Sequence, residues 1–297
     1  MDGIFNINKP CGMTSHDVVA RVRRLLQQKR VGHAGTLDPA ARGVLPICVG
    51  QATRLAEYIS ESGKTYEAEI TFGVVTDTYD SEGTTLRTSD VRGLTLAQVE
   101  PVLSSFFGPQ MQLPPRYSAV KLQGQPAYKR MRAGEEVTLT PRPVEISQLQ
   151  ILDWQSPRLT LLVACSKGTY IRSLAYDIGE RLGCGAYLSA LLRTCSGPFE
   201  LSTSVTLEQL GAAIEQGDIT SYLLPPDSAL SHYPAIYLDA TTSARVLHGN
   251  KFRCDQIHPT TQPVRVYDAR GNFLAIATWD AAQQMWQPGK VLVSTMG

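Results

Sequence analysis

Apolar residues recur at helical spacing in three stretches of the chain. We predict helices over residues 15–28, 95–108 and 171–182, because side chains three or four positions apart are apolar while those between them are mostly polar. Ser15 stands at the start of the first stretch and is of a type that caps helix N-termini. Pro101 lies inside the second, where its missing N–H favours a kink.

Alternation of apolar and polar residues predicts strands elsewhere. It runs over residues 66–74 and again over residues 159–165, so each strand would turn one face to a core and the other outward. Strands and helices do not follow one another with the regularity of a doubly wound fold. We therefore predict an α+β fold, with a mixed, mainly antiparallel sheet and flanking helices.

The pattern changes near residue 231. Helical spacing gives way to short runs typical of strands, with a hairpin-loop signal over residues 268–272. A segment of this length can form only a small β-barrel or a similar module. The chain thus divides into a large unit over residues 1–230 and a small β unit over residues 231–297. The strand-like runs of the small unit are 235–238, 264–267 and 273–278.

Composition bears on location and on metal binding. With 43% apolar and 19% charged residues, the chain resembles an ordinary globular protein. No stretch is long and apolar enough to span a membrane, and the first residues lack a signal-peptide pattern, so we expect a cytoplasmic protein without membrane contact. The six cysteines include no C-x-x-C pair and the five histidines form no ligand pattern with them. Neither a metal site nor a disulfide framework is therefore predicted.

Charge is distributed unevenly along the chain. Residues 1–54 hold eight basic side chains (Lys and Arg) and three acidic ones (Asp and Glu). Residues 55–100 hold three basic and nine acidic side chains, and residues 116–145 hold six basic and three acidic ones. Basic segments can gather into a face that holds phosphates, although the whole chain has a net charge of only +1. Folding can equally well mix the charges, and the sequence leaves both possibilities open.

The densest candidate chemistry lies in residues 31–50. This stretch is rich in glycine and proline, which favours a long loop of specific shape over a regular helix. It carries His33, Asp38 and Arg42, and ionisable groups on a loop held by a rigid body are a plausible catalytic arrangement. Pro39 favours an extended conformation at Asp38. An aspartate in an ordinary proline turn is the alternative.

Several enzyme classes lack their motifs in this chain. It contains no G-x-S-x-G elbow, no G-x-x-x-x-G-K-[ST] loop and, in the candidate loop, no G-x-G-x-x-G sequence. Nucleotide hydrolysis and dinucleotide redox chemistry are therefore disfavoured.

A series of motifs over about residues 3–195 resembles the bacterial tRNA pseudouridine synthases of the TruB type. They stand in that family's order along the chain, and the segment after residue 231 resembles a PUA module, an RNA-binding β-barrel. The motifs are Asn8-Lys9-Pro10, Gly32-His33-Ala34-Gly35-Thr36-Leu37-Asp38-Pro39, Gly50-Gln51-Ala52-Thr53, Lys64-Thr65-Tyr66, Thr76-Asp77-Thr78-Tyr79-Asp80, Pro114-Pro115-Arg116-Tyr117-Ser118-Ala119-Val120-Lys121, Ser166-Lys167-Gly168-Thr169-Tyr170-Ile171-Arg172 and Gly183-Cys184-Gly185-Ala186.

The resemblance implies an isomerase that acts on RNA. Enzymes of this family convert the uridine at position 55, in the T-loop of transfer RNA, to pseudouridine. The bond from the ribose to N1 is cut, the uracil turns in the pocket, and C5 is joined to the ribose. The resemblance further implies transfer RNA as the partner and no cofactor. We also expect a monomer without a metal, although the sequence does not reveal the oligomeric state.

The family's essential aspartate falls on Asp38. Its carboxylate must be ionised whether it attacks the ribose or removes a sugar proton, and the sequence does not decide between these two steps. A nearby guanidinium favours the charged form of a carboxyl group. The resemblance places that partner at Arg172.

Other pocket roles follow from the same resemblance. Extraction of a base from a folded RNA loop costs stacking energy, which contacts in the pocket must offset. Tyr66 would stack on the base, Tyr170 and Leu191 would form a second wall, and His33 would enter the vacated space. Asp80 would position its neighbours. The structural alternative for Tyr66, Tyr170 and Leu191 is ordinary core packing. For His33 it is a loop histidine hydrogen-bonded to the backbone.

The resemblance also assigns RNA contacts and a brace. Residues 116–145 resemble a mobile insertion that grips RNA, and their positive charge suits phosphate contacts. Lys9 and Pro10 would brace the active-site loop. Tyr79 departs from the family, where a small residue is expected. The residues assigned to RNA are Arg116, Lys121, Lys129, Arg130 and Arg132.

Two other functions are compatible with the same fold. One is a non-catalytic RNA-binding or tRNA-folding protein, although Asp38, Tyr66 and Arg172 are all intact. The other is a guide-dependent, dyskerin-type synthase, whose characteristic extensions do not fit into 297 residues.

Overall fold

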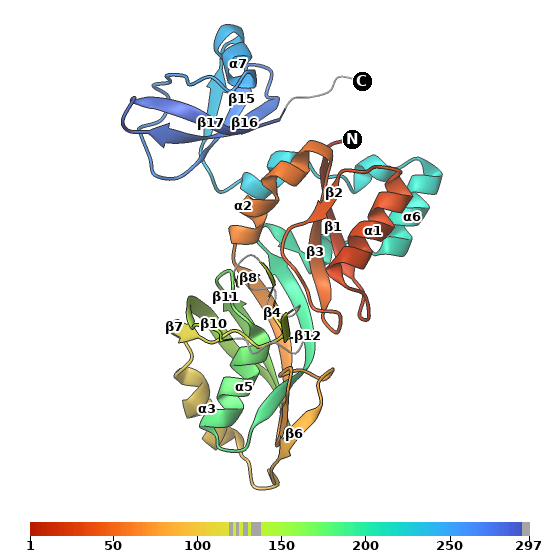
Figure 1. Ribbon diagram of the computed structural model, residues 1–297. Helices are drawn as coiled ribbons and strands as arrows, with labels where there is room; N and C mark the ends of the chain where they lie inside the picture. Colours follow the sequence, from red (N-terminus) through yellow and green to blue (C-terminus); the bar gives the residue numbers. More distant parts are fainter. Residues whose placement is uncertain (119–120, 123–124, 127–129, 132–137, 293–297) are drawn as a thin grey trace.

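A computed structural model describes residues 1–118, 121–122, 125–126, 130–131 and 138–292. It has a large body built on a single twisted sheet and a smaller C-terminal unit (Figure 1). The body contains the N-terminus, and the C-terminal unit packs against that same end of it.

The described part of the chain has nine strands in the main sheet. Neighbouring strands are antiparallel, apart from a short parallel pairing between β12 and β3. This confirms the mixed, mainly antiparallel sheet. Its path is β1 (Gly3–Lys9), β3 (Arg42–Val49), β12 (Ala186–Ser196), β4 (Lys64–Phe72), β11 (Arg158–Cys165), β10 (Arg142–Gln155) and β7 (Gly108–Gln112), with β2 (Val31–His33) paired to β3 and β13 (Phe199–Glu200) paired to β12.

Helices flank the sheet as expected. The helix α1 contacts β2 and α6, while α5 packs on β12 and β4 (Figure 1). Two short hairpins complete the body, β5 (Val74–Thr76) with β6 (Thr85–Thr88) and β8 (Lys121–Leu122) with β9 (Gln125–Pro126). The helices are α1 (Ser15–Leu26), α2 (Ala56–Glu61), α3 (Leu96–Ser104), α5 (Ile171–Arg181) and α6 (Leu207–Gln216).

The three predicted helices are present with shifted ends. The helix α1 stops at Leu26, because Gln27 takes the left-handed conformation with φ 50°. The helix α3 ends at Ser104 instead of continuing to Gly108, where the edge strand β7 begins. Of the two predicted strands, β4 ends at Phe72, one residue before a glycine with φ 88°.

The prediction of one long loop over residues 31–50 is wrong. Strands occupy both ends of this stretch, and only residues 34–41 form the loop between β2 and β3. The run Val44–Val49 is almost entirely buried and pairs with β1, so it is a core strand whose proline is tolerated. The Pro46 carbonyl accepts a hydrogen bond from the Ala34 N–H at 2.9 Å.

The C-terminal unit is a separate four-stranded sheet. It consists of β14 (Ala235–Leu238), β15 (Val264–Asp268), β16 (Phe273–Asp280) and β17 (Met285–Val291), three of which match the predicted runs. The helix α7 (Ala240–Leu247) was not predicted. Asp239 caps this helix by accepting a hydrogen bond from the Thr242 N–H at 2.8 Å.

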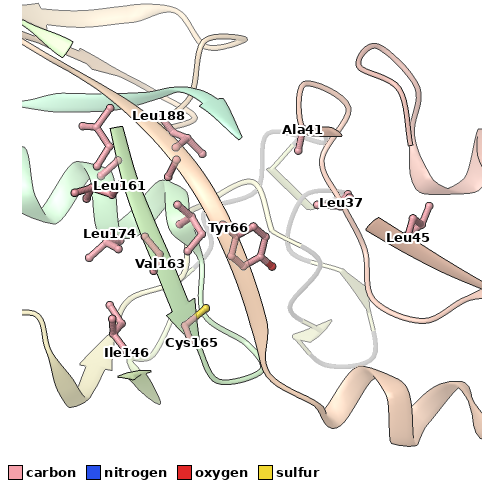
Figure 2. Close-up of a cluster of buried hydrophobic side chains, with 14 of the residues drawn as sticks. Leu37, Ala41, Leu45, Tyr66, Ile146, Leu161, Val163, Cys165, Leu174 and Leu188 are labelled. Atoms are coloured by element: carbon pink, nitrogen blue, oxygen red, sulfur yellow. The ribbon is translucent and has the colours of Figure 1, made fainter. Parts of the chain in front are cut away.

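The largest core lies behind the strand that carries Tyr66. Side chains of α5, β11 and β10 pack there against the inner face of β4. Figure 2 shows Tyr66 projecting from β4 between this core, near Val163 and Cys165, and the loop that carries Leu37 and Ala41. Across the described ranges, no helix is long and apolar enough to cross a membrane.

Candidate active site

The loop of residues 34–41 brings Asp38 to the rim of a pocket of about 250 Å³. The pocket lies between this loop and the strands β4 and β12. Five of the residues singled out in the sequence line it together, although they come from four different segments of the chain. They are Asp38, Tyr66, Tyr170, Arg172 and Leu191.

Buried donors hold the loop on either side of Asp38. The Ser15 hydroxyl donates to the Leu37 carbonyl at 3.0 Å and accepts from the Leu37 N–H at 2.9 Å. The fully buried Lys9 ammonium donates to the Pro39 carbonyl at 3.2 Å. These bonds fix the backbone immediately before and after Asp38. The structure thus places Lys9 where a brace of the loop would lie, while Pro10 is exposed.

Arg172 joins the two acidic residues of the site. Its Nε lies 2.9 Å from Asp38 Oδ2, and its Nη1 lies 3.3 Å from Asp80 Oδ2. The guanidinium also donates to the Thr78 carbonyl at 3.2 Å and to the Tyr117 carbonyl at 3.1 Å. Because the side chain is almost fully buried, these contacts hold it in one position next to Asp38.

A tight turn presents Asp80 to Arg172. The Thr76 hydroxyl donates to the Asp80 carbonyl at 2.8 Å, and the Thr78 hydroxyl donates to Asp80 Oδ1 at 2.5 Å. Tyr79 lies between them with φ 62° and stacks on Tyr176, with ring centroids 4.0 Å apart. Asp80 is therefore fixed on both sides and contacts Arg172 instead of opening into the main pocket.

Opposing effects act on the Asp38 carboxyl. Burial raises the pKa of Asp38, Arg172 lowers it, and the nearby Asp80 raises it again. The expected guanidinium partner is present, but burial outweighs it. The Asp38 side chain nevertheless keeps 40% of its surface exposed, and the water that reaches it limits the effect of burial.

Comparison with known proteins identifies the family. The model of the TruB family pseudouridylate synthase N-terminal domain matches residues 23–171, and two C-terminal TruB models match residues 172–231 and 234–286. A tRNA pseudouridine synthase B of Dehalococcoides mccartyi is 46% identical over 295 residues, covering 99% of this chain and 97% of the relative. The chain belongs to the TruB family. It is therefore a pseudouridine synthase, an isomerase.

Another relative carries the same name, and solved structures share the fold. A tRNA pseudouridine synthase B of Symbiobacterium thermophilum is 51% identical over 252 residues, which cover 84% of this chain and 82% of the relative. A chain in a Cbf5-Nop10-Gar1 complex has 27% identity and a TM-score of 0.75, covering 97% of this chain and 84% of its own length. A chain in an H/ACA RNP bound to a substrate RNA containing 2′-deoxyuridine shares the fold, with a TM-score of 0.76 at 24% identity. The match covers 99% of this chain and 86% of that chain.

Other residues singled out by the TruB resemblance lie away from the pocket. His33 stands at the base of the loop, edge-on to His16 with ring centroids 5.2 Å apart. Burial lowers the pKa of His33 to about 4, and the charges of His16 and Arg193 add to this. Its Nδ1 is buried and has no hydrogen-bond partner within the described ranges.

The residues assigned to RNA are only partly described. Arg116 is exposed, Arg130 is half-buried, and Lys121 belongs to β8. Lys129 and Arg132 lie outside the described residues. Their assignment to RNA therefore stays a prediction.

Three further residues build the TruB pocket and were not predicted from the sequence. Arg193 is buried and donates to the Val44, Thr36 and Gly35 carbonyls at 2.7, 3.3 and 3.2 Å. Lys64 lines the pocket wall. Gln112 holds the start of α5 by bonds to the N–H and carbonyl of Tyr170. A motif contains Lys64, whereas nothing in the sequence marks the other two.

Proposed function

We propose that this TruB-family chain converts the uridine at position 55 in the T-loop of transfer RNA to pseudouridine, with Asp38 as the catalytic residue. The observation that carries the assignment of Asp38 is its ion pair with the buried Arg172 at the rim of a pocket beside Tyr66. An acid, a fixed cation and an aromatic ring thus surround one space. That is the arrangement an isomerase of an extracted base requires.

The ion pair prepares Asp38 for the cleavage step. Arg172 favours the carboxylate, and solvent at the mouth of the pocket limits the opposing effect of burial. An ionised Asp38 can either attack C1′ of the ribose or remove the proton from C2′. Asp80 holds the other side of Arg172, so its role is to position the guanidinium.

The aromatic residues receive the base. Tyr66 stacks on the uracil from its position on β4, and Tyr170 and Leu191 form the opposite wall. His33 fills the space that the base leaves in the RNA. Burial keeps its imidazole neutral at physiological pH. A neutral imidazole can contact stacked bases without a charge to desolvate.

Basic side chains hold the remaining transfer RNA. Arg116, Lys121, Lys129, Arg130 and Arg132 contact phosphates, and the unit over residues 231–297 adds contacts to the same RNA. These contacts position the substrate. We infer a monomer that works in the cytoplasm without a cofactor and divides near residue 230.

Replacement of Asp38 tests this function. The wild type, incubated with unmodified transfer RNA and no guide RNA, should form pseudouridine at position 55, detected by carbodiimide treatment and primer extension. Asp38→Asn should abolish the product and keep RNA affinity within about tenfold, because size and loop geometry are preserved. Asp153→Asn, at an exposed carboxylate on β10, is the matched control.

Each possible result has a clear meaning. Turnover by Asp38→Asn would refute the catalytic assignment. A wild type that binds transfer RNA without modifying it would favour the non-catalytic alternative. Activity that appears only when a guide RNA is added would favour the guide-dependent alternative.

A further inference from the structure

Two cations buried in the wall of the pocket have no acidic partner within the described ranges. Lys64 is 8% exposed and Arg193 is 1% exposed, and both line the same pocket as Asp38. Among the described residues, neither forms an ion pair with a carboxylate. Burial of an unpaired charge is costly, and two such charges together are more costly still.

Neutral carbonyl groups hold both side chains. Arg193 donates to three backbone carbonyls, as described above. The Lys64 ammonium donates to the Ser60 and Ser62 carbonyls, both at 2.5 Å, at the C-terminal end of α2. These bonds position the cations but do not cancel their charge. An ammonium group has three N–H donors, so Lys64 keeps one donor beyond these two bonds.

The charges around the pocket therefore do not balance. Asp38 is the one acid among the described lining residues, and it is paired with Arg172, which also contacts Asp80 outside the pocket. Burial lowers the pKa of Lys64 to about 8, and the charge of Arg193 adds to this. The other charged or titratable groups that act on Lys64 are Cys165, Glu61 and Lys167, and Glu61 is paired with the exposed Lys167. The wall beneath Tyr66 remains positive.

The reaction produces an anion in this space. When the bond between C1′ and N1 breaks, its electron pair leaves with the uracil, and the negative charge spreads over N1, O2 and O4. This holds whether a carboxylate oxygen of Asp38 bonds to C1′ or Asp38 accepts the proton from C2′. Fixed donors that face a developing negative charge stabilise the transition state.

We propose that Lys64, together with the Arg193–Tyr66 pair, forms an anion site that stabilises the detached uracil while it turns. Arg193 of β12 and Tyr66 of β4 are cross-strand partners, and the charge of Arg193 acts against the rise that burial causes in the pKa of Tyr66. Because a guanidinium can only donate, the Tyr66 O–H stays free to donate into the pocket. Lys64 supplies the second donor and the charge. The inference rests on the proposed function, since it names groups that serve the same reaction.

The simplest alternative is that Lys64 only caps α2. Lys64→Met removes the charge and keeps the length of the side chain, while Lys64→Arg keeps a cation. Lys167→Met is the matched control, because it removes an exposed lysine near the same pocket. The substrates are T-loop stem-loops with uridine or 5-fluorouridine at the target position. Fluorine withdraws electrons and stabilises the uracil anion by itself, so that substrate should depend less on the protein.

Single-turnover cleavage of the glycosidic bond at pH 6.5, where Lys64 is charged, gives the decisive comparison. Lys64→Met should lose about 10²-fold or more on uridine, the usual effect of one donor to a developing anion, but less than about tenfold on 5-fluorouridine. Lys64→Arg should regain part of the rate. Lys167→Met should stay within about threefold of the wild type on both RNAs.

Equal losses on both RNAs would reduce Lys64 to a structural cap and overturn the inference. A loss of RNA affinity with an unchanged cleavage rate would do so too, because the cation would then hold a phosphate. If Lys64→Met does not fold, the pH dependence of the wild-type cleavage rate on uridine tests the proposal instead. That rate should fall above about pH 8, and a flat profile from pH 7 to 9 would refute the site. A wild type that leaves both RNAs unchanged would refute the proposed function itself.

Discussion

Individual side chains in this protein do more than one task, and Arg172 is the clearest case. Its Nε contacts the Asp38 carboxylate, while Nη1 and Nη2 bind the turn around Asp80 and the Tyr117 carbonyl. A lysine could supply the charge but not these three directions at once. The position of Asp38 relative to the pocket therefore depends on the planar shape of the guanidinium as well as on its charge.

His33 makes a prediction about stability at acid pH. An unfolded histidine binds a proton below about pH 6.5, whereas burial lowers the pKa of His33 to about 4 in the folded protein. Between these values the unfolded state binds more protons. His33 therefore makes the free energy of unfolding fall as the pH falls from about 6.5 to 4.

Replacement of the imidazole should weaken this dependence. Urea denaturation of the wild type and of His33→Asn at pH 7.5, 6.5, 5.5 and 4.5 measures it. The slope of unfolding free energy against pH should be smaller in the variant over the acid range, while the two slopes should agree above pH 7. Identical slopes down to pH 4.5 would show that His33 titrates normally in the folded protein.

At the scale of elements, the site depends on a close approach between two strands. Gly43 of β3 pairs with Arg193 of β12, and a Cβ on Gly43 would lie 2.2 Å from the Arg193 carbonyl oxygen. Gly43 also has φ 104°, in the region that favours glycine. This contact fixes β3, and with it the end of the loop that carries Asp38, against the strand that carries Leu191.

Gly43→Ala should therefore damage both stability and activity. We expect the free energy of unfolding to fall by roughly 2–4 kcal/mol, because a strained backbone and a steric clash occur together. Gly217→Ala is the control, since Gly217 has φ 76° but nothing within 4 Å of the added Cβ. Denaturant unfolding and single-turnover rates measure both effects. Equal losses in the two variants would show that the approach to Arg193 is not restrictive.

The same strands show what the sequence could and could not predict. Strict alternation located β4 and β11, and helical spacing located α1, α3 and α5, because one face of each is buried. The strand β3 is buried on both faces, so it has no alternation, and its glycines resembled a loop. Gly43 allows β3 to approach β12 closely, and this contact between distant segments cannot be predicted from the local sequence.

The candidate site divides in a similar way. Motifs marked Asp38, Tyr66 and Arg172, and the fold places them around one pocket. Arg193 lies in no motif, since its role comes from carbonyl groups about 150 residues earlier in the chain, at Gly35, Thr36 and Val44. Contacts over such distances in sequence exist only after the sheet has formed.

For the molecule as a whole, the structure bears on whether the charges stay segregated. The acidic segment 55–100 does not form an isolated face. Glu57 pairs with Lys290 of the C-terminal unit at 2.8 Å, and Glu61 pairs with Lys167. Folding thus mixes part of the charge. The first of these pairs also joins the two units, so the large body and the C-terminal sheet are not independent.

Apolar contacts join the two units as well. Ile276 and Leu292 belong to the same buried cluster as Ile4 and Leu55 of the body. The Arg54 guanidinium donates to the Val291 carbonyl at 2.5 Å. The body therefore gains stability from the C-terminal unit, although every residue of the candidate active site precedes it.

Truncation after residue 234 should separate stability from catalysis. The shortened chain keeps Tyr233, whose ring packs edge-on against Tyr58 at 6.3 Å, but exposes the apolar patch under Ile276 and Leu292. Loss of these two side chains corresponds to roughly 2–4 kcal/mol, so the melting temperature should fall by roughly 5–15 °C. Turnover on a T-loop stem-loop at saturating enzyme should persist, because the pocket is intact.

Affinity for whole transfer RNA should fall if the C-terminal sheet binds RNA, and equal affinity would refute that role. A truncated chain that is insoluble, or inactive on both RNAs, would show that the C-terminal sheet is part of the catalytic body and that no boundary lies near residue 230.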